Sequence, residues 1–184
     1  MVMTIGVLPF GNSDRRILQR IKEGLEGVFP ETKALVIDQG FPLPERDLDK
    51  TRGQYRSNQI LGIIQSHDSY ERVNRLLGVI DADIYAQGLN FVFGEATFPG
   101  KAALISLWRL RPEFYKNAPN FESFAERSLK EAIHEVGHTL GVRHCPRSSC
   151  VMHFSNSIFD TDKKESMFCD ECYLKTALAI NALE

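Results

Sequence analysis

The chain has 184 residues, of which 43% are hydrophobic and 25% are charged, and its formal net charge is −2. These values are typical of one globular domain and give no electrostatic case for binding nucleic acid or an anionic membrane. No apolar run approaches the roughly 20 residues that cross a bilayer. Residues 1–10 lack a basic segment and a cleavage site, so we expect a cytoplasmic protein.

The first part of the chain alternates predicted strands with predicted helices. Apolar runs predict strands over residues 3–8, 33–37, 79–85, 90–94 and 102–110. Helical spacing predicts helices over residues 13–28 (with Ser13 as a cap), 54–65 and 70–77. Prolines and glycines predict a loop over residues 41–49 and a turn over residues 98–100. This alternation indicates an α/β fold whose sheet contains parallel pairs.

A longer helix is predicted to begin at Ser123, which forms a capping box with Glu126, and to end at Gly141. One face of this helix carries the apolar residues Ala125, Leu129, Ala132, Ile133, Val136 and Leu140. The opposite face carries the polar residues Arg127, Glu131, His134 and His138. We therefore expect the apolar face to pack on the core and the histidines to face a cleft.

Residues 134–144 read H-E-V-G-H-T-L-G-V-R-H. His134 and His138 are four residues apart on a helix, so their imidazoles can share one metal ion. Glu135 lies about 100° around the helix from His134 and is placed to act as a general base on metal-activated water. Gly141 can end the helix in the left-handed conformation, after which His144 follows as a third ligand. Three imidazoles leave one zinc position open, as in a catalytic site.

A single histidine is usually a surface or structural residue, and H-E-x-x-H also occurs by chance in helices. The glycine and the third histidine at fixed offsets favour the zinc interpretation here. All four cysteines follow this motif, in the pattern C-x4-C and then C-x2-C: Cys145, Cys150, Cys169 and Cys172. Two close pairs suit a closed, structural zinc site with four thiolate ligands.

The segment after Gly141 is too short to bury a self-sufficient apolar core, so we expect the second metal to stabilise it and to hold His144 in place. Two disulfides are the alternative, and a cytoplasmic location argues against them. A redox or metal sensor built on the four thiols is a further interpretation.

The motif at residues 134–144 resembles the long zinc-binding motif of metzincin metallopeptidases. The cysteines that follow narrow the resemblance to the archaemetzincin family, in which four cysteines bind a second zinc. The resemblance implies a single metallopeptidase domain over residues 1–184. Its upper part, residues 1–141, is expected to hold a twisted mixed, mostly parallel sheet and the active-site helix. Its lower part, residues 142–184, is expected to hold the four-cysteine zinc site and a last helix from about residue 170 to residue 183.

The resemblance also implies residue roles. Two zinc ions are expected per chain, and the catalytic one lies on the three histidines with Glu135 as the base. Met152 is expected to form the Met-turn beneath the zinc ligands, although a methionine at such a spacing is more often a simple packing residue. Many metzincins carry a different residue after the third histidine, where this chain has Cys145.

The expected function is zinc-dependent hydrolysis of a peptide or protein substrate. The edge strand, expected at residues 91–96, would bind an extended peptide by strand addition, unless Phe91 and Phe93 belong to an inner strand. No other substrate-binding residue is indicated. Because no inhibitory pro-segment is visible, we expect a restricted cleft or a narrow substrate range. The alternative is a non-hydrolytic zinc protein whose cleft binds a peptide or partner, but such a site has no use for Glu135.

Overall fold

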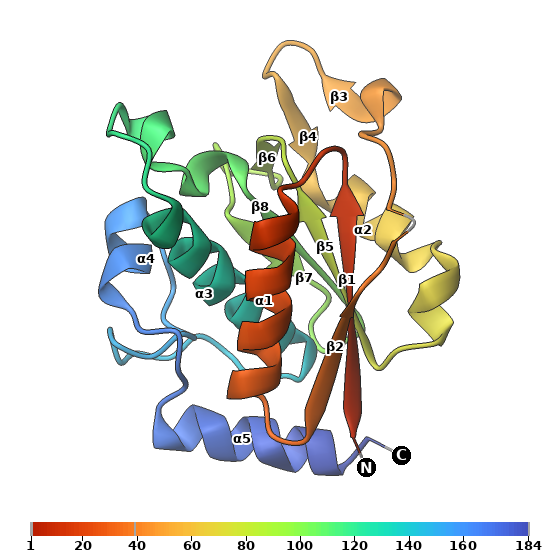
Figure 1. The fold of residues 1–184 in the computed structure, drawn as a ribbon, viewed down its shortest axis with the longest axis vertical. Coiled ribbons are helices and arrows are strands. Elements are labelled where there is room, and N and C mark those ends of the chain that lie inside the picture. Colours follow the sequence, from red (N-terminus) through yellow and green to blue (C-terminus); the bar gives the residue numbers. More distant parts are fainter. Residues whose placement is uncertain (1, 39, 184) are drawn as a thin grey trace.

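The computed structural model describes residues 2–38 and 40–183. Its main sheet has five strands in the order β2-β1-β5-β8-β7. The strands are β1 (Met3–Phe10), β2 (Thr32–Val36), β5 (Arg75–Ile80), β7 (Gly94–Ala96) and β8 (Ala102–Ser106). The first four strands in this order run parallel to one another. At the edge of the sheet, β7 pairs with β8 in the antiparallel direction. The expected mixed, mostly parallel sheet is therefore confirmed (Figure 1).

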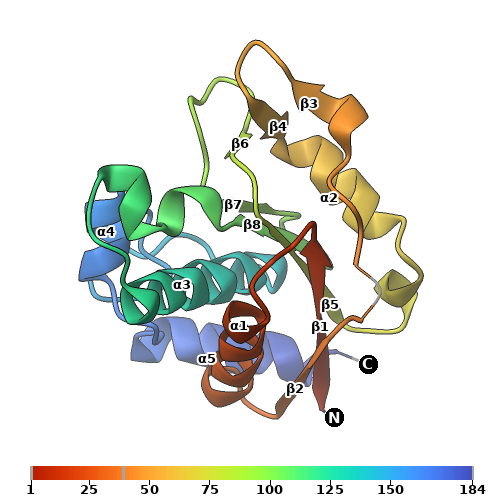
Figure 2. The ribbon, with the colours of Figure 1, turned by 45° about the horizontal axis from the view of Figure 1, so that its top comes forward.

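Helices cover both faces of this sheet, as Figures 1 and 2 show. Helices α1 (Arg15–Val28) and α3 (Phe121–Thr139) pack on one face, and α2 (Ser57–Gln65) packs on the other. Side chains of a strand alternate between the faces, and all of those of β5 and β8 are buried. Strands buried on both faces read as continuous apolar runs, which explains why β8 stands out in the sequence.

The remaining elements are short or follow α3 in the chain. A second sheet contains β3 (Leu48–Asp49), β4 (Gln54–Arg56) and β6 (Ile84–Tyr85). The 3-10 helices are η1 (Glu45–Asp47), η2 (Asp68–Glu71), η3 (Trp108–Leu110) and η4 (Pro112–Tyr115). After α3 come α4 (Ile158–Lys163) and α5 (Asp170–Asn181). None of the helices among the described residues is long and apolar enough to cross a membrane.

The part of the chain after α3 shares the core of the part before it. Ile158 and Ile180 are buried in the same apolar cluster as Ile133 and Val136 of α3. The last helix forms as expected, whereas α4 lies in a segment for which no helix was predicted. Ser157 and Asp160 form a capping box at its start, which stabilises this short helix.

Several predicted elements and element boundaries differ from the structure. The segment 70–77, predicted as a helix, instead contains the end of η2 and the start of the buried strand β5. The segment 54–65 is helical only from Ser57, because the preceding residues pair with β3 and β6. The strand predicted at 90–94 begins at Gly94, and the one predicted at 102–110 ends at Ser106. Short apolar runs fit a buried strand and a buried helix equally well, so tertiary pairing decides between them.

The caps of the two long helices also differ from the prediction. The Asn120 side chain accepts a hydrogen bond of 2.9 Å from the backbone N–H of Ser123, so α3 begins at Phe121. The capping box expected at Ser123 is therefore wrong. Asp14, rather than Ser13, caps α1 by accepting from the backbone N–H of Arg16.

Replacing Asn120 with alanine is expected to lower the free energy of unfolding by about 1 kcal/mol, because one N–H group at the start of α3 loses its partner. Urea unfolding measures this change. Ser123→Ala is the matched control and should change stability by much less. Equal losses for the two variants would contradict the assignment of the cap.

The polar face of α3 is buried rather than exposed. Arg127, Lys130 and Glu131 each have less than a tenth of their surface exposed. The guanidinium of Arg127 donates two hydrogen bonds of 2.7 Å to the carboxylate of Asp162 in α4. Arg127, which the sequence places on the same face of the helix as the histidines, therefore lies away from the cleft, because the segment containing α4 covers this part of the helix.

Candidate active site

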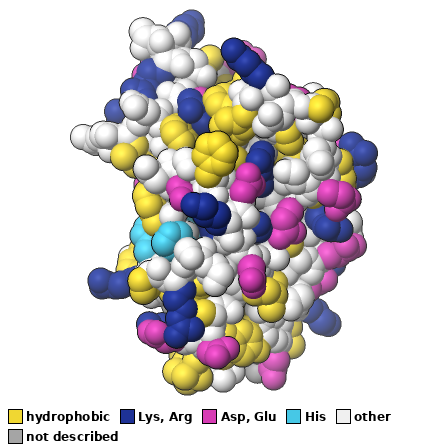
Figure 3. Space-filling model, turned by 90° about the vertical axis from the view of Figure 1, so that its left-hand side faces the viewer, with side chains coloured by type: hydrophobic (Ala, Val, Ile, Leu, Met, Phe, Trp, Pro, Cys, Tyr) yellow, Lys and Arg dark blue, Asp and Glu magenta, His cyan; other side chains and the backbone are white. Residues whose placement is uncertain are grey.

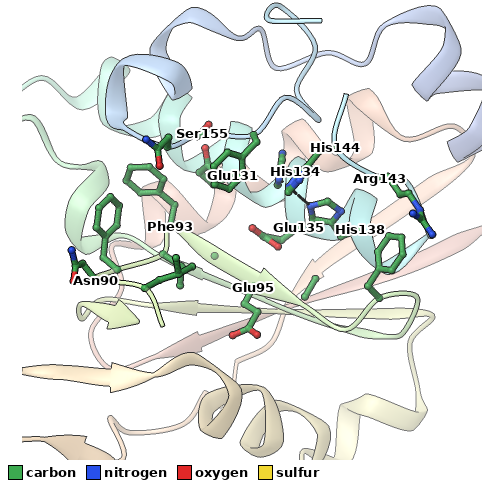
Figure 4. Close-up of a pocket in the computed structure, with 18 residues that line it drawn as sticks. Asn90, Phe93, Glu95, Glu131, His134, Glu135, His138, Arg143, His144 and Ser155 are labelled. Carbon is green, nitrogen blue, oxygen red and sulfur yellow. Dashed lines mark hydrogen bonds between the residues drawn. The ribbon is translucent and has the colours of Figure 1, made fainter. Parts of the chain in front are cut away.

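A cleft of about 860 Å³ lies between the edge strand β7 and the helix α3. Its walls come from residues 89–96, from α3 and from the later segments 143–144 and 154–156. Figure 3 shows histidine side chains at the left edge of the view, where the outline of the molecule is indented. In the close-up of Figure 4, Phe93, Glu131 and Ser155 lie to one side of Glu135, and Arg143 lies to the other.

The three histidines of the motif converge in this cleft (Figure 4). The Nε2 atom of His138 lies 3.0 Å from that of His134 and 3.2 Å from that of His144. A tetrahedral zinc ion holds nitrogen ligands about 2.0–2.1 Å away, which places them about 3.3 Å from one another. The spacing of these atoms therefore fits a zinc ion.

In two of these histidines, the hydrogen bond that Nδ1 makes determines which ring nitrogen carries the proton. Nδ1 of His134 lies 2.8 Å from the carbonyl oxygen of Val151, and Nδ1 of His138 lies 2.8 Å from that of Val142. A carbonyl only accepts, so each Nδ1 carries the proton and each Nε2 presents a lone pair. Lone pairs that converge at this distance repel one another unless a cation lies between them. The carbonyls act as the outer partners usual for metal-binding histidines.

Burial keeps the imidazoles neutral. Desolvation lowers the pKa of His134 well below its ordinary value and lowers that of His138 to about 4. It also lowers the pKa of His144, which is more exposed. At pH 7 the three rings are therefore in the form that binds metal.

The end of α3 brings the third histidine back to the first two. Gly141 has φ +81°, in the left-handed region that glycine adopts without steric strain. The N–H of Val142 donates to the carbonyl oxygen of Gly137, which closes the helix. The chain then turns so that His144 lies next to His138, as the spacing of the motif predicted.

Glu135 lies between the histidines and the edge strand. Its side chain is 5% exposed and packs against Gly94 of β7. A Cβ atom built on Gly94 would lie 2.6 Å from Cγ of Glu135 and 2.6 Å from the carbonyl oxygen of Leu104. Only glycine allows β7 to approach Glu135 this closely, so Gly94 is a site residue that the sequence motif did not indicate.

Replacing Gly94 with alanine is expected to lower the free energy of unfolding by about 1–3 kcal/mol through overpacking. Because the sequence predicts Glu135 to be the general base of a peptidase, displacement of its carboxylate should also lower kcat/KM about 10- to 100-fold. Peptide hydrolysis and urea unfolding measure the two effects. The control is Gly62→Ala on α2, where an added Cβ meets no atom within 4 Å. A Gly94→Ala variant with parental activity would contradict this role.

Burial raises the pKa of Glu135 well above its ordinary value of 4.5, and the nearby Glu131 raises it further, whereas Lys164 acts in the opposite direction. Below pH 4.5 the folded and unfolded states both carry the proton. As the pH rises above 4.5, only the unfolded carboxyl ionises freely, so stability falls by up to about 1.4 kcal/mol per pH unit until the folded pKa is reached.

Replacing Glu135 with glutamine is therefore expected to stabilise the protein, once a chelator has stripped the histidine site, by more at pH 8 than at pH 5. The glutamine side chain does not titrate, so the difference from the parent grows with pH. Urea unfolding of both proteins at the two pH values measures it. A difference that does not depend on pH would show that the Glu135 carboxyl titrates normally.

The four cysteines form a second cluster. One Sγ atom from each lies within 4.8 Å of the others, and Cys145 and Cys169 have their Sγ atoms 3.8 Å apart. All four are free thiols, so the structure does not contain the alternative pair of disulfides. Tetrahedral zinc, with bonds of about 2.3 Å to sulfur, would hold such atoms about 3.8 Å apart. The cluster fits a closed four-thiolate site.

The thiols have unequal pKa values. Burial alone would raise the pKa of Cys169, but the backbone N–H of Cys172 and the neighbouring thiols donate to its sulfur and lower the pKa to about 7. Burial and the nearby Cys150 raise the pKa of Cys172 strongly. Four thiolates this close together need a bound cation to ionise together.

Residues 7–177 match the model of peptidase family M54. The chain belongs to peptidase family M54. Among similar proteins, the archaemetzincin of Methanocaldococcus jannaschii is 45% identical over 175 residues, which cover 95% of this chain and 93% of that protein. The archaemetzincin of Pyrococcus abyssi is 40% identical over 179 residues, covering 95% of each chain.

Solved structures agree with this assignment to family M54. The crystal structure of the Methanopyrus kandleri archaemetzincin has a TM-score of 0.86 and 34% identity, covering 98% of this chain and 96% of that one. The Archaeoglobus fulgidus archaemetzincin, crystallised with malonate, has a TM-score of 0.80 and 35% identity, covering 94% of this chain and 99% of that one. The resemblance to archaemetzincins is confirmed, and the chain is a zinc metallopeptidase.

Met152 packs against α3 at Gly137, which lies between His134 and His138 in the sequence. It is fully buried, and a Cβ built on Gly137 of α3 would lie 2.6 Å from its Sδ atom. The preceding residue, Val151, supplies the carbonyl that accepts from His134. The turn around Met152 thus lies against α3, and its role as the Met-turn stays a prediction.

The edge strand of the M54 cleft is shorter than predicted. Only Gly94–Ala96 pairs with β8, while Phe93 is buried in the core and Phe91 packs against it. The part of the prediction that placed Phe91 and Phe93 in an edge strand is therefore wrong. Two exposed aromatic rings of the cleft, Phe98 beside His138 and Phe154 beside His144, were also not predicted.

Proposed function

We propose that this protein cleaves peptide bonds in the cleft between β7 and α3. His134, His138 and His144 would hold the catalytic zinc ion, and Glu135 would be the general base. The observation that carries this proposal is the convergence of three Nε2 atoms, two of them on rings whose Nδ1 faces a carbonyl oxygen, beside one buried carboxyl group. Membership of a zinc peptidase family supports it.

When bound there, zinc supplies a Lewis acid that lowers the pKa of water to about 7 and polarises the peptide carbonyl. Glu135 would accept the proton of the attacking water and deliver it to the leaving amine. Burial supports this role, because it raises the pKa of Glu135 above its ordinary value and so makes its carboxylate a stronger base. Gly94 allows the carboxyl group to lie between the histidines and the edge strand.

The substrate would lie along β7. The outer side of this edge strand offers backbone N–H and C=O groups to an extended peptide, which adds as a further strand. Phe98 and Phe154, which are 47% and 51% exposed, flank the histidines and offer apolar surface to its side chains. The short length of β7 suits a short stretch of peptide.

The four cysteines would bind a second, structural zinc. Cys145 directly follows His144, and its partners Cys169 and Cys172 lie at the start of α5. The metal would therefore tie the third histidine to a helix that packs on the core. This arrangement supports two zinc ions per chain with different roles.

A non-hydrolytic zinc protein would be expected to close the histidine site with a fourth protein ligand. Among the residues that the structure describes, no further histidine, cysteine or acidic side chain joins the three histidines at metal-binding distance. An open position next to Glu135 favours hydrolysis.

Metal analysis combined with a peptide-library digest tests the proposal. We expect two zinc ions per chain, of which a mild chelator removes only the one on the histidines. Cleavage should stop when that zinc is removed and resume when zinc is added back. A His138→Ala variant should hold one zinc and cleave nothing. Cleavage that persists after removal of the histidine-bound zinc would contradict the proposal.

A further inference from the structure

A fully buried ion pair joins the active-site helix to the segment after α4. Lys164 and Glu131 have side-chain exposures of 0% and 3%, and Nζ of Lys164 lies 3.0 Å from Oε1 of Glu131. The hydroxyl of Thr161 donates to the same oxygen at 3.0 Å. Burying two charges is unfavourable, and an apolar pair is often at least as stable, so such a pair is weak evidence for a purely stabilising role.

The position of this pair links it to the site. Glu131 lies one helical turn before Glu135 and forms part of the cleft wall (Figure 4). Nζ of Lys164 also reaches the carbonyl oxygen of His153, at 3.5 Å. The residue after it, Glu165, donates from its backbone N–H to the carbonyl oxygen of Ser149 at 2.8 Å.

Residues 149–153 form a turn, and several of them are hydrogen-bonded to Lys164 or to the residues that follow it. The N–H of Val151 donates to the carbonyl oxygen of Met167 at 2.9 Å, and its own carbonyl oxygen accepts from His134. The carbonyl oxygen of Met152 accepts from the N–H of Cys145, next to His144. A shift of this turn would change the orientation of two of the three imidazoles.

A second ion pair offers a comparison. Arg127 and Asp162 join the same helix to the residues around α4 through two hydrogen bonds of 2.7 Å. Arg127 also donates to the carbonyl oxygen of Leu110, at the opposite end of α3 from the histidines. Its hydrogen bonds do not reach residues 149–153, so this pair attaches α3 to the α4 region without contacting the turn.

We infer that Lys164 and Glu131 are positioning residues of the metallopeptidase site. Their ion pair fixes the turn 149–153 against α3, keeps the Val151 carbonyl on His134, and thereby sets the zinc affinity of the three histidines. This inference rests on the proposed assignment of the catalytic zinc to those histidines.

The double variant Glu131→Gln/Lys164→Met tests the inference without leaving a lone buried charge. Zinc is removed from the histidine site with a mild chelator and titrated back in competition with that chelator, and a His144→Ala variant identifies which binding step belongs to the histidines. We expect the double variant to stay folded and to bind this zinc 10- to 100-fold more weakly, as is usual when the outer partners of ligands are lost.

The matched control is Arg127→Met/Asp162→Asn, which removes the other ion pair and should bind zinc with parental affinity. Thr161→Val is the milder second variant, with an expected loss of a few-fold, and it decides the question if the double variant does not fold. If the double variant folds and binds zinc with parental affinity, the inference is overturned. If the double variant does not fold, parental zinc affinity in Thr161→Val overturns it.

Two further results separate this inference from the proposed function. An equal loss of zinc affinity in the control would show that any tie between α3 and the α4 region has the same effect, so the inference alone would fall. If His144→Ala leaves every zinc-binding step unchanged, the histidines do not hold zinc, and the proposed function falls together with the inference.

Discussion

Replacing Glu135 with glutamine is expected to lower kcat/KM for peptide hydrolysis by about 10²- to 10⁴-fold, the contribution typical of a general acid–base residue. Glutamine has nearly the same shape and keeps the packing against Gly94. It cannot accept the proton of the attacking water. The zinc content should stay at the parental value, because Glu135 is not part of the three-histidine cluster.

A fluorogenic peptide identified from the library digest measures the rates, and metal analysis of the same samples measures zinc. The control is Glu126→Gln, which removes a carboxylate that is 41% exposed near the start of the same helix and should leave the rate unchanged. Hydrolysis by Glu135→Gln within about threefold of the parent would show that another group acts as the base. Loss of zinc from the variant would show that Glu135 contributes to metal binding.

Replacing Cys169 with serine is expected to destabilise the protein by several kcal/mol and to lower peptide hydrolysis as well. Zinc binding to structural sites contributes about 10–16 kcal/mol in zinc-finger peptides, and removing one thiolate loses part of that free energy. The residue stands at the N-cap of α5, where serine is favourable, so the helix itself should not suffer. The loss would therefore report on the metal.

Thermal unfolding, zinc content and hydrolysis are measured together on this variant. The neighbouring Asp170→Ser is the control, because Asp170 is exposed and lies outside the cysteine cluster. Full stability and full activity of Cys169→Ser would show that the cluster neither holds a structural metal nor positions His144. Lower stability with unchanged activity would show that the metal stabilises the fold but does not position His144 for hydrolysis.

The site was predictable from sequence to the extent that it is local. His134, Glu135 and His138 belong to one helix, and the geometry of a helix fixes their relative positions wherever that helix packs. Gly141 ends the helix in a conformation that its own residue type allows, so His144 could be placed as well. The spacing of the cysteines similarly indicated that they form one cluster.

Residues that reach the site from other segments could not be found in this way. Gly94 comes to Glu135 from the edge strand, and Lys164 comes to Glu131 from the segment after α4. Neither lies in a motif, because each role depends only on which segments pack together. A buried lysine and an exposed one look the same in a sequence until the partner is known.

The fold shows the same division. Periodicity was sufficient for α1 and α3, because each is long enough to repeat its apolar pattern several times. It failed at residues 70–77, where a short apolar run became the buried strand β5 after pairing with β1 and β8. The sequence by itself determined the predicted metal ligands, since His134, His138 and His144 lie within one helix and the turn after it. The tertiary structure alone decided what surrounds it, because contacts between distant segments depend on the packing of the whole chain.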